Sequence, residues 1–515
     1  MSRVQNSIKN SKVGLVLYAF QLFVAFFSRK YFIDYLGSDL LGLNTIAVSL
    51  LNFLNLAELG VGAAIAYSLY SPLLTQDREK IQNILSIQAY LYRNIGFVIL
   101  GTACVLAFFF PYFFGKTNLP LSYAYLTFGV FLFSNLLGYF FNYKQILFEA
   151  DQKLYKVNYI VQGGRILKSL CQIGVLLYMP TPYIPWLGLE VLFAILTSVG
   201  LQLAIQKDYP WLKASPKQGR LLKNKYPDII RKTKQIFFHK IGGIALAQTT
   251  PLLIYAYASL SLVTKYGNYT LITLGITSLI ANLFKGMDGS IGNLIAENNP
   301  SKSQGVFWEL FSFRFWFASV LCVGLFFLSN PFVSLWIGPS FILDSGVLLL
   351  IVASVFIQIT RGVVDSYIAA SGLFQDILAP ILEVSINVGL SILLGYYYGL
   401  HGILAGVLIS LILIIGIWKP FFLFRSKMAD RARWYFLKYG LFALLCVGSI
   451  GIVYGLKQIL GINETTTSFW HLGLYGLKIV GLYSLCSFAL FYLFSEGMRD
   501  FSKRIYRILL NKNPR

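Results

Sequence analysis

The chain has 515 residues, of which 57% are hydrophobic and only 12% charged, and its formal net charge is +22. Soluble domains average about 45–50% apolar and about 25% charged residues, so a soluble fold could not bury this much apolar surface. Apolar stretches of about 20 residues or more recur along the whole chain, and each can cross a hydrocarbon core about 30 Å thick as a helix. The composition therefore predicts an all-α polytopic membrane protein.

Fourteen membrane-spanning helices are expected in chain order. They lie at about 12–34, 40–70, 82–112, 121–148, 154–179, 184–206, 233–260, 267–296, 306–330, 344–370, 376–398, 400–424, 434–456 and 470–494. A cleaved signal peptide is the alternative for the first span. Residues 13–27 lack a small-residue cleavage site, however, and the run continues into Arg29 and Lys30, which favours a retained helix.

The basic residues gather in four clusters, which lie before the first span, between the sixth and seventh, between the twelfth and thirteenth, and in the C-terminal tail. With an even number of spans all four clusters fall on one side, and the opposite loops carry few Lys or Arg. This asymmetry predicts that both termini are cytoplasmic. The basicity then indicates topology and contact with anionic membrane lipids, and it does not indicate nucleic-acid binding.

No metal or cofactor site is predicted. The five cysteines lie inside spans without the spacing of metal ligands, and no HExxH motif is present. His239, beside Lys240, could belong to a proton path, but a single histidine at a helix end is more often interfacial.

An internal repeat links two carboxylates. Residues 55–66 read NLAELGVGAAIA and residues 286–296 read GMDGSIGNLIA, so that an offset of 230 places Glu58 on Asp288 and Gly62 on Gly292. Each segment follows a short outside turn, in the second span of a block of six. A parallel repeat of this kind can enclose a cavity between two lobes.

Three segments carry a resemblance to a known family: FIDYLGSDLLGLNTIAVSLLNFLNLAELGVGAAI, VTKYGNYTLITLGITSLIANLFKGMDGSIGNLIAE and AASGLFQDILAPILEVSINVGLSILLGYYYGLHGILAG. They resemble the polysaccharide transporter family, the oligosaccharide-lipid flippase branch of the multidrug/oligosaccharidyl-lipid/polysaccharide (MOP) exporter superfamily. The resemblance covers roughly residues 12–425. It implies two pseudo-symmetric six-helix lobes around a V-shaped central cavity, with transport by alternating access.

The expected domain boundaries follow the repeat. The N-lobe takes residues 1–206, a basic cytoplasmic linker takes 207–232, the C-lobe takes 233–425, and two peripheral helices with a basic tail take 426–515. The last two spans carry almost no charge in their interior, which is why they are expected to lie outside the functional cavity.

Ionised side chains are costly at the bilayer centre and normally face protein or water with a partner. Spans one to twelve contain about ten such cations and six carboxylates, an excess that suits an anionic substrate. The cations expected to contact a pyrophosphate or sugar are Arg29, Arg165, Lys168, Lys240, Arg314 and Arg361. The alternative for each is pairing with a nearby carboxylate, as Arg361 could pair with Asp365 one turn later.

The carboxylates offer candidate sites for ion coupling or gating. These candidates are Glu58, Glu190, Asp288 and Asp365. For Glu58 the alternative is a helix-packing carboxylate bonded to a neighbour, since it stands beside a row of small residues on which another helix can pack.

The predicted function is a flippase that moves a lipid-pyrophosphate-linked oligosaccharide to the outer leaflet of a bacterial plasma membrane, for assembly of capsule, exopolysaccharide or a similar polymer. Its expected partners are that polyprenyl-linked substrate, membrane lipids and a polysaccharide assembly machinery, and a monomer suffices. Two alternatives stay open: a flippase for the peptidoglycan lipid precursor, and a membrane polymerase or glycosyltransferase. The short outside loops argue against an enzyme.

Overall fold

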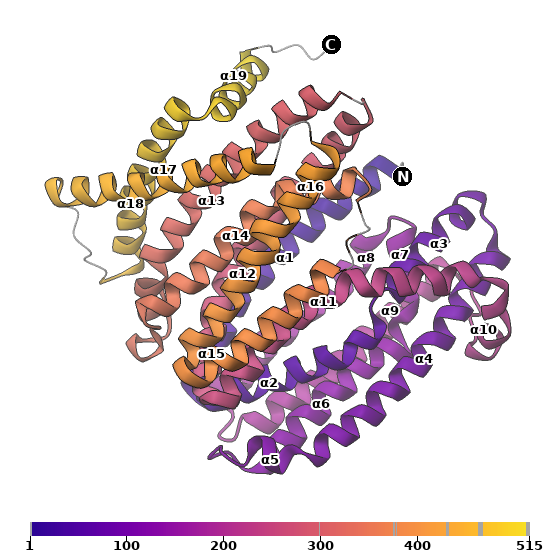
Figure 1. Ribbon diagram of the computed structural model, residues 1–515. Helices are drawn as coiled ribbons and strands as arrows, with labels where there is room; N and C mark the ends of the chain where they lie inside the picture. The colour runs from indigo at the N-terminus through magenta and orange to yellow at the C-terminus, as the bar shows by residue number, and fades with distance from the viewer. Residues whose placement is uncertain are drawn as a thin grey trace. The chain divides into compact units, whose positions relative to one another are not determined.

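A computed structural model describes residues 3–297, 299–373, 376, 378–428, 432–461 and 467–510; within these ranges, the side chains of 3–8, 57, 232, 234–247, 282–283, 285–286, 288–289 and 508–510 are not described. Every regular element in the described ranges is helical, which confirms the all-α prediction (Figure 1). The chain divides into two compact units, one up to Thr264 and one from Lys265.

The first unit contains eleven α-helices and three short 3-10 turns. They are α1 Arg3–Leu36, α2 Ser38–Leu54, η1 Asn55–Glu58, α3 Val61–Thr75, α4 Arg78–Phe108, α5 Phe110–Phe114, α6 Leu121–Phe140, η2 Asn142–Gln145, α7 Ile146–Ala150, α8 Leu154–Tyr178, α9 Tyr183–Asp208, α10 Pro216–Leu222, η3 Lys223–Lys225 and α11 Pro227–Tyr257. Helix α1 packs along α8, α8 along α9, and α6 contacts α2, α4 and α9. Helix α11 packs on α2 and α3, so by its contacts it belongs with this unit; the expected lobe boundaries stay a prediction.

Helix α12, Leu260–Ala296, begins in the first unit and continues into the second. The second unit adds α13 Pro300–Ile337, η4 Pro339–Phe341, α14 Ser345–Ala370, α15 Leu378–Ser410, η5 Leu411–Trp418, α16 Lys419–Lys427, α17 Ala432–Ile459, α18 Phe469–Phe494 and α19 Glu496–Leu510. Helix α13 contacts α14, α18 and α19. Aromatic side chains fill this core, with Phe307, Phe311 and Phe315 buried on one face of α13.

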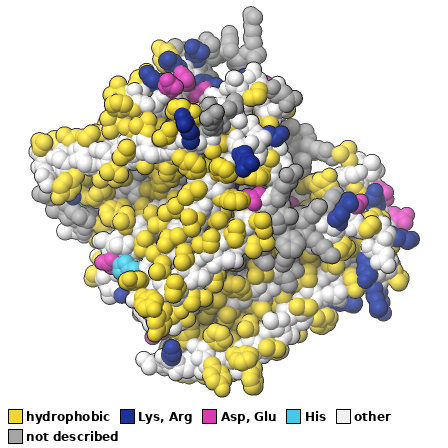
Figure 2. Space-filling view, in the orientation of Figure 1, with side chains coloured by type: hydrophobic (Ala, Val, Ile, Leu, Met, Phe, Trp, Pro, Cys, Tyr) yellow, Lys and Arg dark blue, Asp and Glu magenta, His cyan; other side chains and the backbone are white. Residues whose placement is uncertain are grey.

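Ten helices of the described chain are long and apolar enough to cross a membrane. One of them, Leu378–Lys427, is a hairpin, because Gly399 has a φ of 55° and the Ser391 hydroxyl reaches back to the carbonyl of Ile403, 2.9 Å away. This confirms the tight turn expected at YYYGLHG. Hydrophobic side chains cover much of the surface in Figure 2, as helices that face lipid require. The number of spans, fourteen, stays a prediction.

The two segments expected to form a cytoplasmic linker and a C-terminal tail contain helices. In the linker, α10 lies so close to α4 that a Cβ on Gly219 would stand 1.9 Å from the carbonyl oxygen of Ser86. In the tail, α19 packs on α13, with the rings of Phe313 and Phe501 stacked at 4.3 Å and Arg504 paired with Glu309 at 2.9 Å. In α19 basic residues are interspersed with apolar ones, a pattern typical of an amphipathic helix at a membrane surface.

Candidate functional site

Glu58 lies at a break in the second predicted span. Helix α2 ends at Leu54, the 3-10 turn η1 carries Glu58, and α3 begins at Val61. Between them Gly60 has a φ of 94°, in the left-handed region that glycine enters without steric cost. The break turns the Glu58 side chain away from the helix axis and starts a new helix N-terminus beside it.

Two tyrosines from other helices hold the Glu58 carboxylate. The Tyr92 hydroxyl of α4 donates to Oε1, and the Tyr139 hydroxyl of α6 stands 2.9 Å from Oε2. The Tyr139 hydroxyl also lies 2.9 Å from Oδ1 of Asn55, which accepts a further bond of 2.8 Å from Nδ2 of Asn135. Hydrogen bonds to a charged acceptor stabilise it by about 1.5–3 kcal/mol each, so the carboxylate is held without a cation.

A cavity of about 500 Å³ opens beside this network, wholly within the first unit. Its walls come from η1, α3, α4, α6, η2, α7 and α8. The polar side chains that line it are Asn55, Glu58, Gln88, Tyr92, Asn135, Tyr139, Tyr143, Gln145 and Glu149. Among the described residues that line it, none is Lys or Arg, so the cavity holds two carboxylates and otherwise neutral polar groups.

Arg29 and Arg165, both candidate substrate contacts, differ in their surroundings. Arg29 of α1 donates from Nη2 to the carbonyl of Thr264 at 3.1 Å, which ties it to the start of α12. Arg165 lies near the middle of α8 and is exposed, and no described side chain or carbonyl bonds to it.

Lys168 and Glu190 were expected in different roles, but they pair with each other. The Lys168 ammonium lies 2.7 Å from Oε2 of Glu190, and Nε2 of Gln172 donates to Oε1 at 2.9 Å. These contacts join α8 to α9. Because each group already has its partner, the geometry favours the pairing alternative for both.

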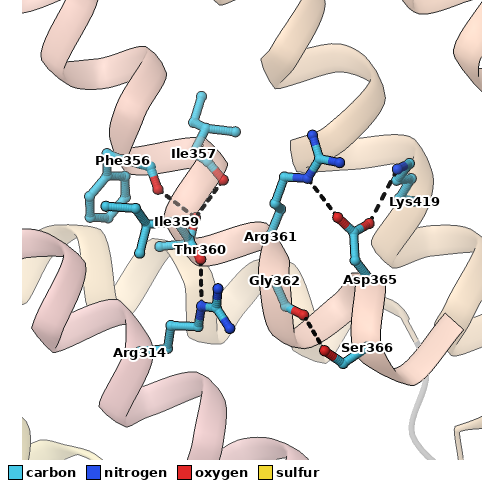
Figure 3. A network of polar contacts seen from close by, with 10 residues as sticks. All are labelled: Arg314, Phe356, Ile357, Ile359, Thr360, Arg361, Gly362, Asp365, Ser366 and Lys419. Atoms are coloured by element: carbon cyan, nitrogen blue, oxygen red, sulfur yellow. Dashed lines mark hydrogen bonds and ion pairs between the residues drawn. The ribbon is translucent and has the colours of Figure 1, made fainter. Parts of the chain in front are cut away.

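The second unit holds a cluster of four charges; Figure 3 shows Arg361, Asp365 and Lys419, and the fourth member is Glu383. Arg361 Nε lies 2.6 Å from Oδ2 of Asp365, one turn later on α14, and the Lys419 ammonium at the start of α16 lies 3.2 Å from Oδ1. Glu383, 6% exposed on α15, interacts with both cations. Two cations and two carboxylates balance, so this cluster, which we call the Asp365 cluster, carries none of the positive excess predicted from the sequence.

Arg314 lies against α14, on the side of that helix opposite the Asp365 cluster (Figure 3). Its Nε donates to the carbonyl of Ile359 at 2.6 Å, and its guanidinium carbon stands 4.5 Å from the centre of the Phe284 ring. Gly362 makes this position possible, because a Cβ there would stand 2.1 Å from Nη2 of Arg314. The arginine was predicted from the sequence, whereas the glycine that makes room for it was not.

Two candidates lie outside the described residues. The side chains of Lys240 on α11 and Asp288 on α12 are not described, so their predicted roles stay predictions. The backbones of the two repeat segments differ: α12 runs unbroken through residue 288, whereas the segment of Glu58 is divided by η1.

A hydrogen-bonded pair also closes the turn after η4 in the second unit. Asp344 accepts hydrogen bonds from Nε2 of His401 at 3.0 Å and from the backbone N–H of Gly346 at 2.8 Å. These bonds lower the pKa of Asp344, with the His401 bond the larger cause. The pair joins the start of α14 to the turn of the α15 hairpin.

Several residues of these sites were missed in the sequence. Tyr92, Tyr139 and Gln88 were not singled out, because tyrosines in a span are mostly interfacial anchors and a lone glutamine carries no motif. Their polarity inside a predicted span was the available signal, since a buried polar group needs a partner.

Two solved structures share the fold. The lipid II flippase MurJ, in an inward closed conformation, is 16% identical with a TM-score of 0.65, and the match covers 98% of this chain and 100% of that one. An inward-facing multidrug resistance MATE family transporter of the MOP superfamily is 12% identical with a TM-score of 0.60, covering 82% and 100%. No protein-family model and no curated protein matches the chain. At these identities the likeness shows the fold alone, which the chain shares with that flippase and that transporter.

Proposed function

From the MOP transporter fold, we propose that the chain is a flippase that carries a polyprenyl-pyrophosphate-linked oligosaccharide from the inner to the outer leaflet of a bacterial plasma membrane. The oligosaccharide would serve assembly of a capsule, exopolysaccharide or O-antigen-type polymer, and the protein would deliver it to a polysaccharide assembly machinery. The transporter works as a monomer by alternating access, with both termini in the cytoplasm.

Arg165 is the observation that carries this proposal. Its exposed guanidinium lies near the middle of α8, a helix of 25 residues that is apolar enough to span the membrane. An arginine at this depth is costly against lipid, so it is expected to face water or an anion. A guanidinium matches the oxygens of a phosphate with two parallel hydrogen bonds, which suits it to a pyrophosphate that leaves the headgroup region.

The other cations divide into two groups. Arg29 and Arg314 are bonded to backbone carbonyls, and we propose that their guanidinium groups, each with five N–H donors, contact the pyrophosphate as it passes. Lys168 and Arg361 are paired with carboxylates, so that they position helices first and reach substrate only if those pairs open. Lys240 is proposed on its sequence position alone.

Energy coupling has two possible sources. An inside-negative potential assists outward movement of an anion by about 2.3 kcal/mol per charge per 100 mV. A coupled proton or sodium ion would need a carboxylate that changes its partner during the cycle. Of the four candidates Glu58, Glu190, Asp288 and Asp365, Glu58 alone among those described is held by neutral donors, so it is the one we propose for gating.

A flippase for a peptidoglycan lipid precursor is the second candidate. It is favoured by the match to the lipid II flippase, which extends over 98% of this chain. Both candidates move a polyprenyl pyrophosphate that bears sugars, and they differ in the sugars. A membrane polymerase or glycosyltransferase is the alternative from another class, and both solved structures with this fold are transporters.

The test is complementation of a bacterium that lacks its own repeat-unit flippase, with surface polymer and lipid-linked precursor both followed. Wild-type protein should restore surface polymer, and Arg165→Ala with Arg314→Ala should leave intact precursor on the inner leaflet. Arg220→Ala, an exposed cation of the linker, is the matched control and should behave as wild type. Precursor that stays on the inner leaflet although wild-type protein is present would overturn the flippase. Rescue of a strain that lacks its peptidoglycan precursor flippase instead would favour the second candidate.

A further inference from the structure

We propose that the cavity beside Glu58 binds a sugar residue of the transported lipid through its hydroxyl groups, and that the pyrophosphate is held elsewhere. This inference rests on the proposed function and assigns one part of the substrate to one place in the first unit. The protein would then recognise the sugar at one place and the charged pyrophosphate at another.

The cavity is built for a neutral polar ligand. Its volume of about 500 Å³ is far larger than a single ion or water needs, since a water occupies about 30 Å³ in the liquid. A phosphate would be repelled there, because two carboxylates, Glu58 and Glu149, line the cavity and none of its described lining residues is Lys or Arg. A sugar hydroxyl is neutral, and it both donates and accepts a hydrogen bond.

A residue that lines the cavity carries an unpartnered acceptor. Gln88 is 1% exposed, and its Nε2 donates to the carbonyl of Tyr143 at 3.1 Å, which fixes the orientation of the amide. Its Oε1 is buried and has no hydrogen-bond partner among the described residues. Leaving such an acceptor unpaired is unfavourable, so a hydroxyl that donates to it would recover that cost on binding.

Donors lie beside these acceptors. The first turn of α3 begins at Val61, no side chain caps it, and Gly62 and Ala63 of that turn line the cavity. The N–H groups of a first helical turn have no partner within the helix. Glu58, already held by two tyrosines, keeps further lone pairs for a second acceptor contact. Neighbouring hydroxyls of one sugar could therefore meet a donor and an acceptor together.

Aromatic rings complete the enclosure. Tyr92 and Tyr139 meet edge to face at 5.6 Å, and Tyr143 lines the same cavity from η2. These rings offer apolar surface to the C–H faces of a sugar ring while their neighbours bond its hydroxyls. In the predicted topology α7 and the start of α8 lie toward the cytoplasm, the side on which such a lipid would be loaded.

The experiment compares two lipids in proteoliposomes that contain the purified full-length protein. One is polyprenyl pyrophosphate that bears a single N-acetylhexosamine, and the other is bare polyprenyl pyrophosphate. The variants are Glu58→Gln and Gln88→Met, with Glu79→Gln, an exposed carboxylate near the start of α4, as the control. Transfer between leaflets is measured for each lipid in the presence and absence of sodium, and at two pH values.

We expect wild-type protein to move both lipids. Gln88→Met should slow the sugar-bearing lipid at least tenfold and leave the bare lipid within twofold of wild type. Glu58→Gln should also slow the sugar-bearing lipid at least tenfold, and it should slow this lipid more than the bare lipid, whose passage depends on Glu58 only as the proposed gate. Glu79→Gln should stay within twofold for both. A variant that still moves the bare lipid is folded and still passes the charged pyrophosphate. A loss confined to the sugar-bearing lipid therefore cannot come from misfolding.

Three results with the variants would overturn the inference. They are equal slowing of both lipids, no slowing of either lipid, and a loss of transfer that depends on sodium or pH but not on whether the lipid bears the sugar. The third result would make the cavity a cation site. Movement of the bare lipid alone by wild-type protein would also overturn it, since no sugar would then be recognised. If wild-type protein moved neither lipid, the proposed function itself would fail, which distinguishes the two failures.

Discussion

Glu58 and Asp365 are both carboxylates inside predicted membrane spans, and they are held in opposite ways. Glu58 accepts hydrogen bonds from two neutral phenols beside a cavity of about 500 Å³. Asp365 accepts from an arginine and a lysine, with Glu383 nearby to balance the charge. The first carboxylate keeps its charge facing a space that a ligand can enter, whereas the charge of the second is cancelled by its own neighbours.

The difference separates a binding role from a packing role. A buried ion pair is strongly disrupted when one partner is removed, because the other charge is left uncompensated. A carboxylate held by phenols tolerates neutralisation better, since a phenol can donate to an amide oxygen as well. Stability should therefore depend on Asp365 more than on Glu58, and recognition of the sugar should depend on Glu58 more than on Asp365.

The largest expected effect is that of Asp365→Asn. It removes the carboxylate that Arg361 and Lys419 both contact and leaves Glu383 as the remaining anion of the cluster. The change should cost about 3 kcal/mol of folding free energy, the lower end of the range for a broken ion pair, because this pair is about one-third exposed. Glu58→Gln should cost less than about 1 kcal/mol. Unfolding of both variants in the same detergent measures the two costs, and equal losses would remove the distinction between the sites.

Removal of the phenols should have the next largest effect. Tyr92→Phe and Tyr139→Phe each delete a hydrogen bond to Glu58, and each should destabilise the protein by about 1.5 kcal/mol. In a Glu58→Gln background each cost should fall by about 1 kcal/mol, because the acceptor is no longer charged. A double-mutant cycle on unfolding free energies gives the coupling, and a coupling of zero would mean that the tyrosines do not hold this carboxylate.

The Lys168–Glu190 pair tests whether a candidate substrate contact is structural. Lys168→Met alone should cost about 1–2 kcal/mol, since Glu190 is only 13% exposed and keeps Gln172 as its remaining partner. Lys168→Met with Glu190→Leu should recover most of that cost and, if the pair is structural, most of the transport. Transport that stays lost in the stable double variant would make Lys168 a substrate contact.

The smallest expected change in stability is that of Gly362→Ala. Its Cβ would displace the Arg314 guanidinium, the mobile end of a long side chain, so the cost should stay near 1 kcal/mol. Transport should nevertheless fall as far as in Arg314→Ala, because the guanidinium leaves Ile359 and Phe284. Transport at the wild-type level would show that the position of Arg314 does not matter.

The sequence alone predicted the all-α membrane fold, the helical hairpin at Gly399 and the unusual carboxylate at position 58. These depend on composition, on the length of apolar runs and on glycine in a tight turn, all of which are local. It also predicted that Arg361 could pair with Asp365, because residues four apart on a helix are neighbours.

Only the tertiary structure decided which charges are cancelled and which face a cavity. Tyr139 meets Glu58 across 81 residues, and Lys419 meets Asp365 across 54. Such contacts depend on how each helix is rotated about its axis and on which helix lies beside it. Neither can be read from hydrophobicity, since in a lipid-facing helix apolar residues lie on every side and no polar stripe marks the inner face.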